Sequence, residues 1–337
     1  MRKTRAKLLV VQSFLPREAF EPLKRHGDVY WLEDMDEKEQ DLVLPSIDGI
    51  YAHGWPKSLD AARLSKMRKL RFFQAGNAGV NGIRFDLLPK SVVLCSNAGA
   101  YSGEVAEFAI GLMLAAAKGI VRFDLELRRG RYADGTQSRR RLDELGGRVA
   151  FMRGKTLGII GYGGIGRSTA GLARPFGMKV LAFGRREIHD SGVTPLRGKK
   201  ALTRLLRESD AVVLTLPLTK ATRGFIGKEE LAAMKPDAIL VNVARGELVQ
   251  ARAVYDWLAK NPRSAYATDV WWPKEGGGES FSPDLPFLEL DNFIGTPHAS
   301  GPSALVTGSV AKASIENLMR YLKGNPLKNV VDRAEYS

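Results

Sequence analysis

Short apolar runs alternate with helix-like segments along the first hundred residues. Runs that indicate buried strands occur at residues 8–11, 29–31, 49–52, 70–73 and 92–95. Helical patterns lie between them at 17–25 and 61–66, and a longer pattern rich in Ala, Leu and Met covers 104–118. Strands that alternate with helices predict a parallel sheet that is covered on both faces.

The same alternation resumes at residue 157. The pattern predicts strands at 157–160, 179–183, 211–214, 238–243, 265–269 and 292–295, with helices at 165–176, 201–207, 228–234 and 251–260. After Pro302 the chain is helical again, to Leu322. We therefore expect an α/β protein of two doubly wound parallel-sheet domains. The second domain (101–299) is inserted into the first (1–100 with 300–337), and the last helix packs back on the first domain.

A glycine-rich turn joins the first strand of the second sheet to the helix after it. The turn reads Gly161-Tyr162-Gly163-Gly164-Ile165-Gly166. A strand, this glycine spacing and a helix together are typical of a dinucleotide site, in which the helix N-terminus faces a pyrophosphate. Gly161 would allow the tight turn, Gly163 the approach of phosphate to the backbone, and Gly166 close packing of helix on strand. An ordinary glycine-rich loop is the alternative, and the flanking strand and helix argue against it.

Composition narrows the class of protein. The 337 residues are 44% hydrophobic and 26% charged, as in globular domains, and no apolar run is long enough to cross a membrane. The N-terminal apolar run is too short for a signal peptide, so we expect a cytoplasmic protein. Cys95 is the only cysteine, which excludes an internal disulfide and a thiolate metal cluster. The net charge of +14 fits a solvated surface or the steering of anionic ligands, and no nucleic-acid-binding motif accompanies it.

Three polar side chains follow strands of the second sheet. Arg245 comes directly after one strand, Asp269 ends the next, and His298 follows the last. Ligands bind outside the carboxyl ends of parallel strands, here in a cleft between the two domains. An arginine forks a carboxylate and a histidine donates a proton at neutral pH, which suits hydride transfer on a keto acid. Arg245 is also compatible with a surface ion pair, and Asp269 with either a nicotinamide carboxamide contact or a cap on the following turn.

These residues resemble the D-isomer-specific 2-hydroxyacid dehydrogenases, which include glyoxylate/hydroxypyruvate reductases, phosphoglycerate dehydrogenases and formate dehydrogenases. The resemblance covers nearly the whole chain. Besides the glycine turn, its motifs lie at 75–81, 96–99, 105–107, 217–219 with 222–224, 242–246, 269–271 and 296–298. It implies a Rossmann cofactor domain inserted in a flavodoxin-like substrate domain, and a homodimer joined partly by the helix from Glu104 and the arm after it.

The resemblance also implies roles for individual residues. Arg245 anchors the substrate carboxylate, His298 donates the proton, and a glutamate after Asp269 keeps His298 protonated and oriented. The backbone at Ala78 and Gly79 helps to bind the carboxylate. The residues expected at the cofactor are Gly161, Gly163, Gly164, Ile165, Gly166, Arg185, Arg186, Thr215, Pro217, Thr222, Val243, Ala244, Asp269 and His298.

Two positions depart from the family pattern. The acid usually stands five residues after the strand-end aspartate, where this chain has Lys274. Glu275 follows it, so we assign the acid role to Glu275, with a solvated loop glutamate as the alternative. Formate dehydrogenases have an asparagine where this chain has Tyr101, so formate is not the expected substrate. Tyr101, His53 and Trp271 belong to loops that would shape the substrate side-chain pocket.

The residues after the second strand of the inserted sheet bear on the choice of nicotinamide. Gly184 stands where an NAD-type site places an acid on the ribose hydroxyl, and Arg185 and Arg186 follow. Guanidinium groups would fork a 2′-phosphate, so we expect NADP(H), with NAD as second choice. Exposed surface charge is the alternative for either arginine. The sequence thus predicts an NADP-dependent reductase of a small 2-keto acid, of the glyoxylate or hydroxypyruvate kind, without metal; a nicotinamide-binding redox sensor or corepressor-like protein is the alternative.

Overall fold

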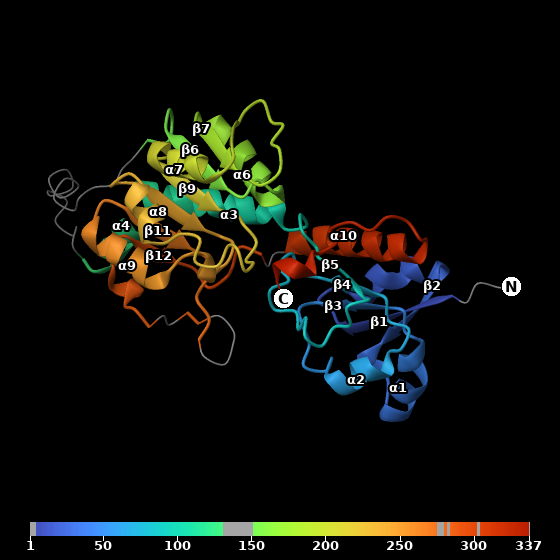
Figure 1. Ribbon diagram of the computed structural model, residues 1–337. Coiled ribbons are helices and arrows are strands. Elements are labelled where there is room, and N and C mark those ends of the chain that lie inside the picture. Colours follow the sequence, from blue (N-terminus) through green and yellow to red (C-terminus); the bar gives the residue numbers. More distant parts are fainter. Residues whose placement is uncertain (1–4, 131–150, 275–279, 282–283, 302–303, 337) are drawn as a thin grey trace. The chain divides into compact units, whose positions relative to one another are not determined.

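The computed structural model describes residues 5–130, 151–274, 280–281, 284–301 and 304–336. The chain divides into two compact units, which we call unit 1 (Met1–Tyr101 with Pro302–Ser337) and unit 2 (Ser102–Gly301). Each unit is built on one sheet whose strands pair in parallel (Figure 1). The predicted fold class, two parallel-sheet α/β domains, is therefore confirmed.

The sheet of unit 1 has five strands in the order β2-β1-β3-β4-β5. They are β1 (Ala6–Gln12), β2 (Gly27–Trp31), β3 (Gly49–Ala52), β4 (Phe72–Ala75) and β5 (Val93–Cys95). β4 begins two residues later than the predicted run at 70–73. The reason is that Leu70, though buried, closes a turn by donating its amide to the Met67 carbonyl at 3.1 Å.

Successive strand residues of unit 1 point to opposite faces of the sheet and pack in two separate hydrophobic cores. Leu8 and Phe72 pack beneath α10 (Ala304–Leu322) and η1 (Arg17–Arg25), whereas Leu9 and Phe73 pack in the core on the opposite face. Tyr321 of α10 stacks on Phe72 with ring centroids 4.5 Å apart. Segment η1 is a 3-10 helix and contains Pro22, which has no amide hydrogen to donate to an α-helical ladder.

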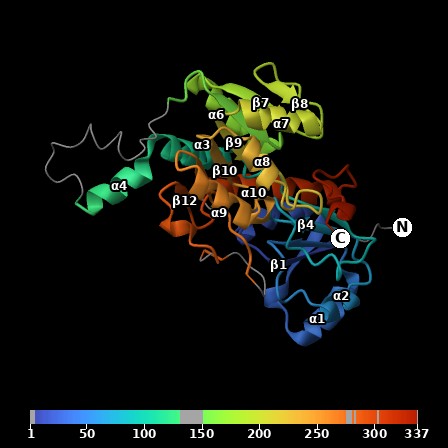
Figure 2. The same ribbon diagram turned by 60° about the vertical axis from the view of Figure 1, so that its left-hand side comes forward.

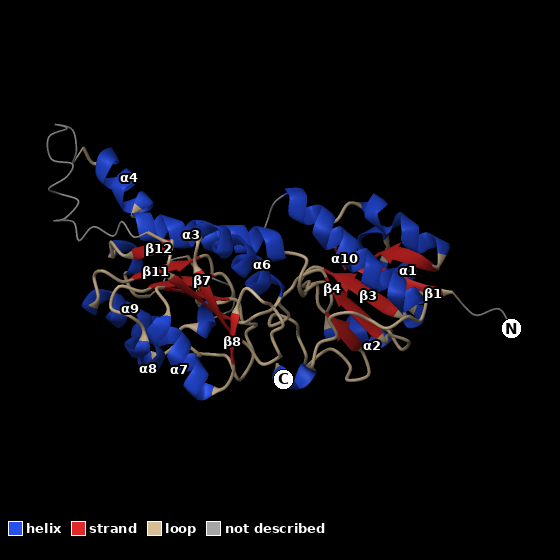
Figure 3. Cartoon of the chain, turned by 90° about the horizontal axis from the view of Figure 1, so that it is seen from above, coloured by secondary structure: helices blue, strands red, loops and turns tan. Residues whose placement is uncertain are grey.

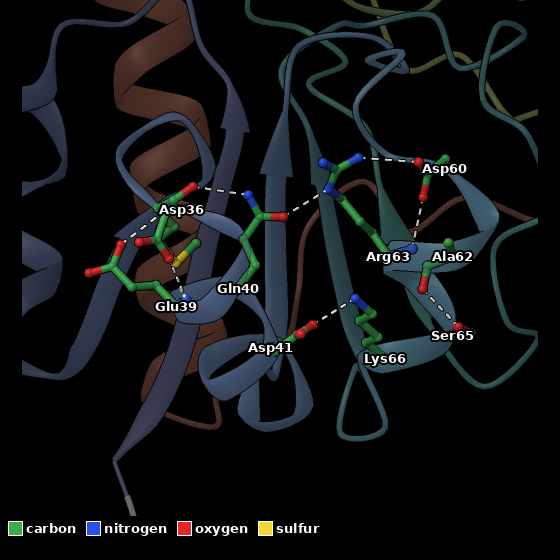
Figure 4. A network of polar contacts seen from close by, with 10 residues as sticks. Asp36, Glu39, Gln40, Asp41, Asp60, Ala62, Arg63, Ser65 and Lys66 are labelled. Atoms are coloured by element: carbon green, nitrogen blue, oxygen red, sulfur yellow. Dashed lines mark hydrogen bonds and ion pairs between the residues drawn. The ribbon is translucent and has the colours of Figure 1, made fainter.

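Two short helices of unit 1, α1 (Glu37–Val43) and α2 (Ala61–Lys66), are joined through their side chains (Figure 4). Arg63 Nε donates to Gln40 Oε1 at 3.0 Å, and Lys66 Nζ lies 2.6 Å from Asp41 Oδ1. Helix α1 was not predicted from the sequence. Its signal is a capping box, in which the side chain of Asp36 accepts from the Glu39 amide and that of Glu39 accepts from the Asp36 amide.

The sheet of unit 2 has seven strands in the order β12-β11-β10-β9-β6-β7-β8. They are β6 (Thr156–Ile160), β7 (Lys179–Phe183), β8 (Thr194–Leu196), β9 (Ala211–Leu214), β10 (Ile239–Asn242), β11 (Ala265–Thr268) and β12 (Phe293–Gly295). The order reverses between β6 and β9, which is the switch point of a doubly wound sheet. β8 was not predicted because it is three residues long and contains Pro195, which an edge strand tolerates.

Helices cover both faces of the unit 2 sheet (Figure 3). One face carries α3 (Ser102–Lys118) and α6 (Gly164–Ala173), and the other carries α7 (Lys199–Glu208), α8 (Lys228–Ala233) and α9 (Ala251–Lys260). Helix α4 (Ile120–Arg128), also unpredicted, follows α3 after a left-handed turn at Gly119 and projects from the unit (Figure 2).

Short 3-10 helices complete the described chain. They are η2 (Leu32–Asp34), η3 (Leu44–Ser46), η4 (Arg174–Phe176), η5 (Gly246–Leu248), η6 (Phe287–Glu289) and η7 (Arg333–Glu335). Across the described residues, no helix is both long enough and apolar enough to span a bilayer.

Candidate functional site

The glycine turn lies at the switch point of unit 2, between β6 and α6. Gly161 has a φ of 102°, in the left-handed region that favours glycine. A Cβ on Gly166 would lie 2.3 Å from the Gly161 carbonyl oxygen, so helix and turn touch there. A Cβ on Gly163 would meet nothing within 4 Å. The first amides of α6 have no carbonyl partners in their own helix, so these residues fit a phosphate-bearing cofactor.

The loop after β7 is joined to this turn. Tyr162 donates its hydroxyl to Asp190 Oδ2 at 2.7 Å. This hydrogen bond lowers the pKa of the Asp190 carboxyl, while burial and the same contact raise the pKa of Tyr162. Arg185 and Arg186 are exposed on the loop, and a Cβ on Gly184 would make only ordinary contacts, the nearest at 3.7 Å. The backbone at Gly184 therefore tolerates a Cβ, so sterics alone do not require glycine there.

The ends of β9 and β10 border the turn. Thr215 donates its hydroxyl to the Gly161 carbonyl. Thr222 closes the loop after β9 by donating to the Pro217 carbonyl at 2.7 Å. Val243 and Ala244, directly after β10, are buried. The sequence-predicted cofactor residues of unit 2 thus lie along the carboxyl edge of one sheet.

Arg245 stands at the end of the turn that follows β10 and is half-buried. The side chain of Asn242, which is fully buried, shapes this turn: its Nδ2 donates to the Arg245 carbonyl at 2.8 Å, and its Oδ1 accepts from the Ala244 amide at 3.1 Å. The guanidinium Nη1 of Arg245 donates to the Ala244 carbonyl at 2.6 Å. A fixed turn therefore presents a planar five-donor group at the sheet edge.

Asp269 and His298 follow the next two strands. Asp269 is fully buried, and its carboxylate accepts from the Thr296 hydroxyl at 2.6 Å and from the amides of Ala299 and Ser300, each at 2.8 Å. His298 is exposed and has a φ of 54°. From the sequence, Asp269 was compatible with a cofactor contact or a cap on the following turn; in the structure its carboxylate holds the segment that carries His298.

Trp271 fixes the same segment from a second point. Its indole Nε1 donates to the Thr296 carbonyl at 2.7 Å, and its ring lies where a Cβ on Gly295 would fall. On the other side, a Cβ on Gly246 would lie 2.2 Å from the Trp271 carbonyl oxygen. The segment after β11 therefore contacts both the arginine turn and the histidine turn.

Unit 1 supplies the remaining candidates, in the segments that follow β3, β4 and β5. The amides of Ala78 and Gly79 donate to no acceptor in the part of the chain that the structure describes. Tyr101 donates its hydroxyl to the Gly76 carbonyl at 3.1 Å, and burial raises its pKa to about 12. Burial lowers the pKa of His53, whose ring lies 4.2 Å from that of Phe14.

Several features of the site were not predicted from the sequence, and one predicted site residue cannot be placed. Glu275 lies outside the described residues. The supporting side chains Asn242, Thr296 and Trp271 were not assigned their positioning contacts, although all three lie in the motifs that carry the family resemblance. Their signal is a residue with a hydrogen-bonding side chain two or three positions from a strand-end candidate.

Comparisons with known proteins agree with this arrangement. The family model for the NAD-binding domain of D-isomer-specific 2-hydroxyacid dehydrogenases matches residues 110–300. A glyoxylate reductase of Aeropyrum pernix is 31% identical over 98% of this chain and 96% of its own length. A D-3-phosphoglycerate dehydrogenase of Methanocaldococcus jannaschii is 33% identical over 80% of this chain, which spans only 49% of that enzyme.

Solved structures show the same fold. A protein of Pyrococcus horikoshii superposes with a TM-score of 0.78 at 27% identity, covering 98% of this chain and 96% of the other. An acyclic imino acid reductase in complex with NADPH and D-Arg superposes with a TM-score of 0.76 at 24% identity, covering 97% of this chain and 100% of the other. At this identity the likeness concerns the fold alone. The family predicted from the motifs is thereby confirmed: this chain belongs to the D-isomer-specific 2-hydroxyacid dehydrogenases, oxidoreductases with a Rossmann nicotinamide-binding domain.

Proposed function

We propose that this protein is an NADP(H)-dependent oxidoreductase that interconverts a small 2-keto acid and its 2-hydroxy acid, of the glyoxylate or hydroxypyruvate kind. The observation that carries the proposal is the placement of Arg245, Asp269 and His298 after three neighbouring strands of the sheet that bears the glycine turn. Relatives named glyoxylate reductase and glyoxylate/hydroxypyruvate reductase B, 31% and 32% identical, support the substrate class.

In the proposed reaction, the cofactor and three side chains each have a separate role. A bound nicotinamide supplies or accepts the hydride. Arg245 holds the keto acid by a bidentate pair with its carboxylate, which also fixes the orientation of the carbonyl. His298 donates a proton to the alkoxide that develops at C2. Glu275 is the proposed acid that orients the imidazole.

Unit 1 is assigned to the substrate. Backbone amides bind carboxylate oxygens without adding charge, and those of Ala78 and Gly79 are available for this. His53 and Tyr101 are proposed to contact the substrate side chain. Burial favours the uncharged form of both rings, so they would accommodate a neutral substituent.

The preference for NADP(H) rests on the loop after β7. The exposed guanidinium groups of Arg185 and Arg186 suit a ribose 2′-phosphate, and Gly184 brings no carboxylate that would repel it. The substitution Gly184→Asp tests this, because a Cβ at this position meets no neighbour closer than 3.7 Å. We expect kcat/KM with NADPH to fall about 10- to 100-fold, since a hydrogen bond to a charged group contributes about 1.5–3 kcal/mol.

The control for that experiment is Gly184→Ala, which adds the Cβ without the charge and should leave the preference unchanged. Efficiency with NADH should hold or rise in the Asp variant. Equal efficiency of the natural chain with NADH and NADPH would refute the NADP assignment.

We also propose a homodimer in which α3 and α4 take part. Helix α4 projects from unit 2 (Figure 2). Its apolar residues Ile120 (56%), Leu125 (45%) and Leu127 (61%) are exposed. Such a run on an exposed helix favours burial against a partner. Sedimentation of the natural chain and of Leu125→Glu tests this: a dimer that the variant dissociates supports it, and a monomeric natural chain contradicts it.

The central test of function is a panel of keto acids with both cofactors. Loss of NADPH absorbance with glyoxylate, hydroxypyruvate, pyruvate or phenylpyruvate supports the reductase. Tight NADPH binding with no turnover on any of them would contradict it and favour a nicotinamide-sensing protein.

A further inference from the structure

The carboxylate of Asp269 is the structural support of the segment 296–300. It is fully buried, and its three donors within the described residues all come from this segment: the Thr296 hydroxyl and Ala299 amide on Oδ1, and the Ser300 amide on Oδ2. The amide of Asp269 itself donates to the Asn242 carbonyl at 3.0 Å, which ties its position to β10. The carboxylate thus connects the histidine segment to the centre of the sheet.

The backbone of His298 shows why support is needed. Its φ of 54° lies in the left-handed region, which is unfavourable for a residue with a Cβ. Such a conformation persists only where surrounding contacts hold it. The donors to Asp269 lie two residues before His298 and one and two residues after it, so they bracket the left-handed residue.

We propose that Asp269 is a positioning residue for His298: its carboxylate holds the left-handed turn from which the imidazole is presented. The catalytic part of this proposal rests on the proposed function, which makes His298 the proton donor. The hydrogen bonds from the turn to Asp269, in contrast, are present in the chain without cofactor. The role is separate from the nicotinamide contact also expected for Asp269, which stays a prediction. A cofactor contact would act on binding, whereas a positioning contact acts on the protonation step.

The substitution Asp269→Asn separates the two roles. The amide has nearly the same size as the carboxylate but only one acceptor oxygen. If the side-chain oxygen of the new asparagine accepts from Thr296 and Ala299, its NH₂ group faces the Ser300 amide. Both of these groups are hydrogen-bond donors, so they repel each other. One hydrogen bond is lost and the end of the turn is pushed away.

Two substitutions at Thr296 form a matched pair of test and control. Thr296→Val keeps the shape but removes the hydroxyl that donates to Asp269, whereas Thr296→Ser keeps the hydroxyl. Thr296 is half-buried and no cofactor role is assigned to it, so Thr296→Val also serves if Asp269→Asn does not fold.

The first readout is amide hydrogen exchange of Ala299 and Ser300 in the cofactor-free protein. We expect exchange about tenfold faster in Asp269→Asn, a smaller increase in Thr296→Val, and the natural rate in Thr296→Ser. Unchanged exchange in both Asp269→Asn and Thr296→Val would overturn the proposal. This readout stands even if the natural chain reduces no keto acid, an outcome that would defeat the proposed function alone.

The second readout is kinetic. Asp269→Asn should lower kcat about 10- to 100-fold, because a small misplacement of a catalytic group has effects of this size. The Kd for NADPH, from fluorescence titration, should change less than about threefold. A Kd weakened tenfold with kcat unchanged at saturating NADPH would identify a cofactor ligand instead and overturn the positioning role.

Discussion

The carboxyl edges of the two sheets present different chemistry. In unit 2 the edge carries an arginine, a carboxylate and a histidine, each at the end of a neighbouring strand. In unit 1 the corresponding edge presents the amides of Ala78 and Gly79 and the rings of His53 and Tyr101, whose neutral forms are favoured by burial. One fold class therefore provides charged groups in one unit and neutral groups in the other.

The difference lies in how each edge is held. In unit 2, buried polar side chains fix the functional turns: Asn242, three residues before Arg245, fixes that of Arg245, and Asp269, at the end of the neighbouring strand, fixes that of His298. In unit 1, the edge depends on packing between strand ends, where Tyr101 bonds to the Gly76 carbonyl and Phe14 covers His53. Substitutions should therefore damage reaction chemistry in unit 2, and side-chain selection and local stability in unit 1.

The largest expected effect is the loss of the proton donor in unit 2. His298→Asn suits this test because asparagine tolerates the left-handed backbone but is not a general acid. We expect kcat for keto acid reduction to fall about 10²- to 10⁴-fold with little change in KM. Turnover near that of the natural chain would remove His298 from the mechanism.

Arg245→Lys comes next. Lysine keeps the charge but loses the planar fork, so we expect kcat/KM to fall about 10- to 100-fold, with most of the effect in KM. The control is Arg223→Lys, a neighbouring arginine 3.3 Å from Glu247 on the surface, which should change neither constant. An equal effect of both substitutions would contradict a specific carboxylate fork at Arg245.

The glycine turn offers a comparison within unit 2. Gly166→Ala would drive a Cβ into the Gly161 carbonyl oxygen, so we expect destabilisation of about 1–3 kcal/mol. Gly163→Ala meets open space and should fold normally while binding NADPH more weakly. Thermal unfolding and NADPH titration of the pair check this; normal NADPH binding by Gly163→Ala would argue against phosphate approach at this residue.

The smallest effect concerns His53 in unit 1. Its pKa in the folded state lies below the ordinary value of 6.5, because burial disfavours the imidazolium. Below pH 6.5 the unfolded chain therefore binds the proton more readily, and this contribution to stability is lost as pH falls toward the folded-state pKa. Urea unfolding at pH 7.5 and 5.5 gives the free energy of unfolding that the protein loses on acidification. This loss should be smaller in His53→Asn than in the natural chain, and smaller also in Phe14→Ala, which uncovers the His53 ring. An unchanged loss in both variants would contradict the assignment.

The same difference between the two edges explains which features of the fold and the site could be predicted from the sequence. The strands of both sheets are visible because buried parallel strands are short continuous apolar runs, and strand-end positions place Arg245, Asp269 and His298 at one edge. The sequence did not show that Asp269 bonds to Thr296, Ala299 and Ser300, because that contact depends on the spatial neighbourhood of β11 and β12. Strand β8 was missed because Thr194-Pro195-Leu196 forms no apolar run and contains a proline.

The most direct measurement is a crystal structure with NADP⁺ and oxamate, an unreactive analogue of a 2-keto acid. We expect both oxygens of the oxamate carboxylate about 2.7–2.9 Å from the Arg245 guanidinium. We also expect the His298 imidazole within about 2.6–3.2 Å of the oxamate carbonyl oxygen. Oxamate bound away from Arg245, or a His298 imidazole out of hydrogen-bonding reach of that oxygen, would contradict the account.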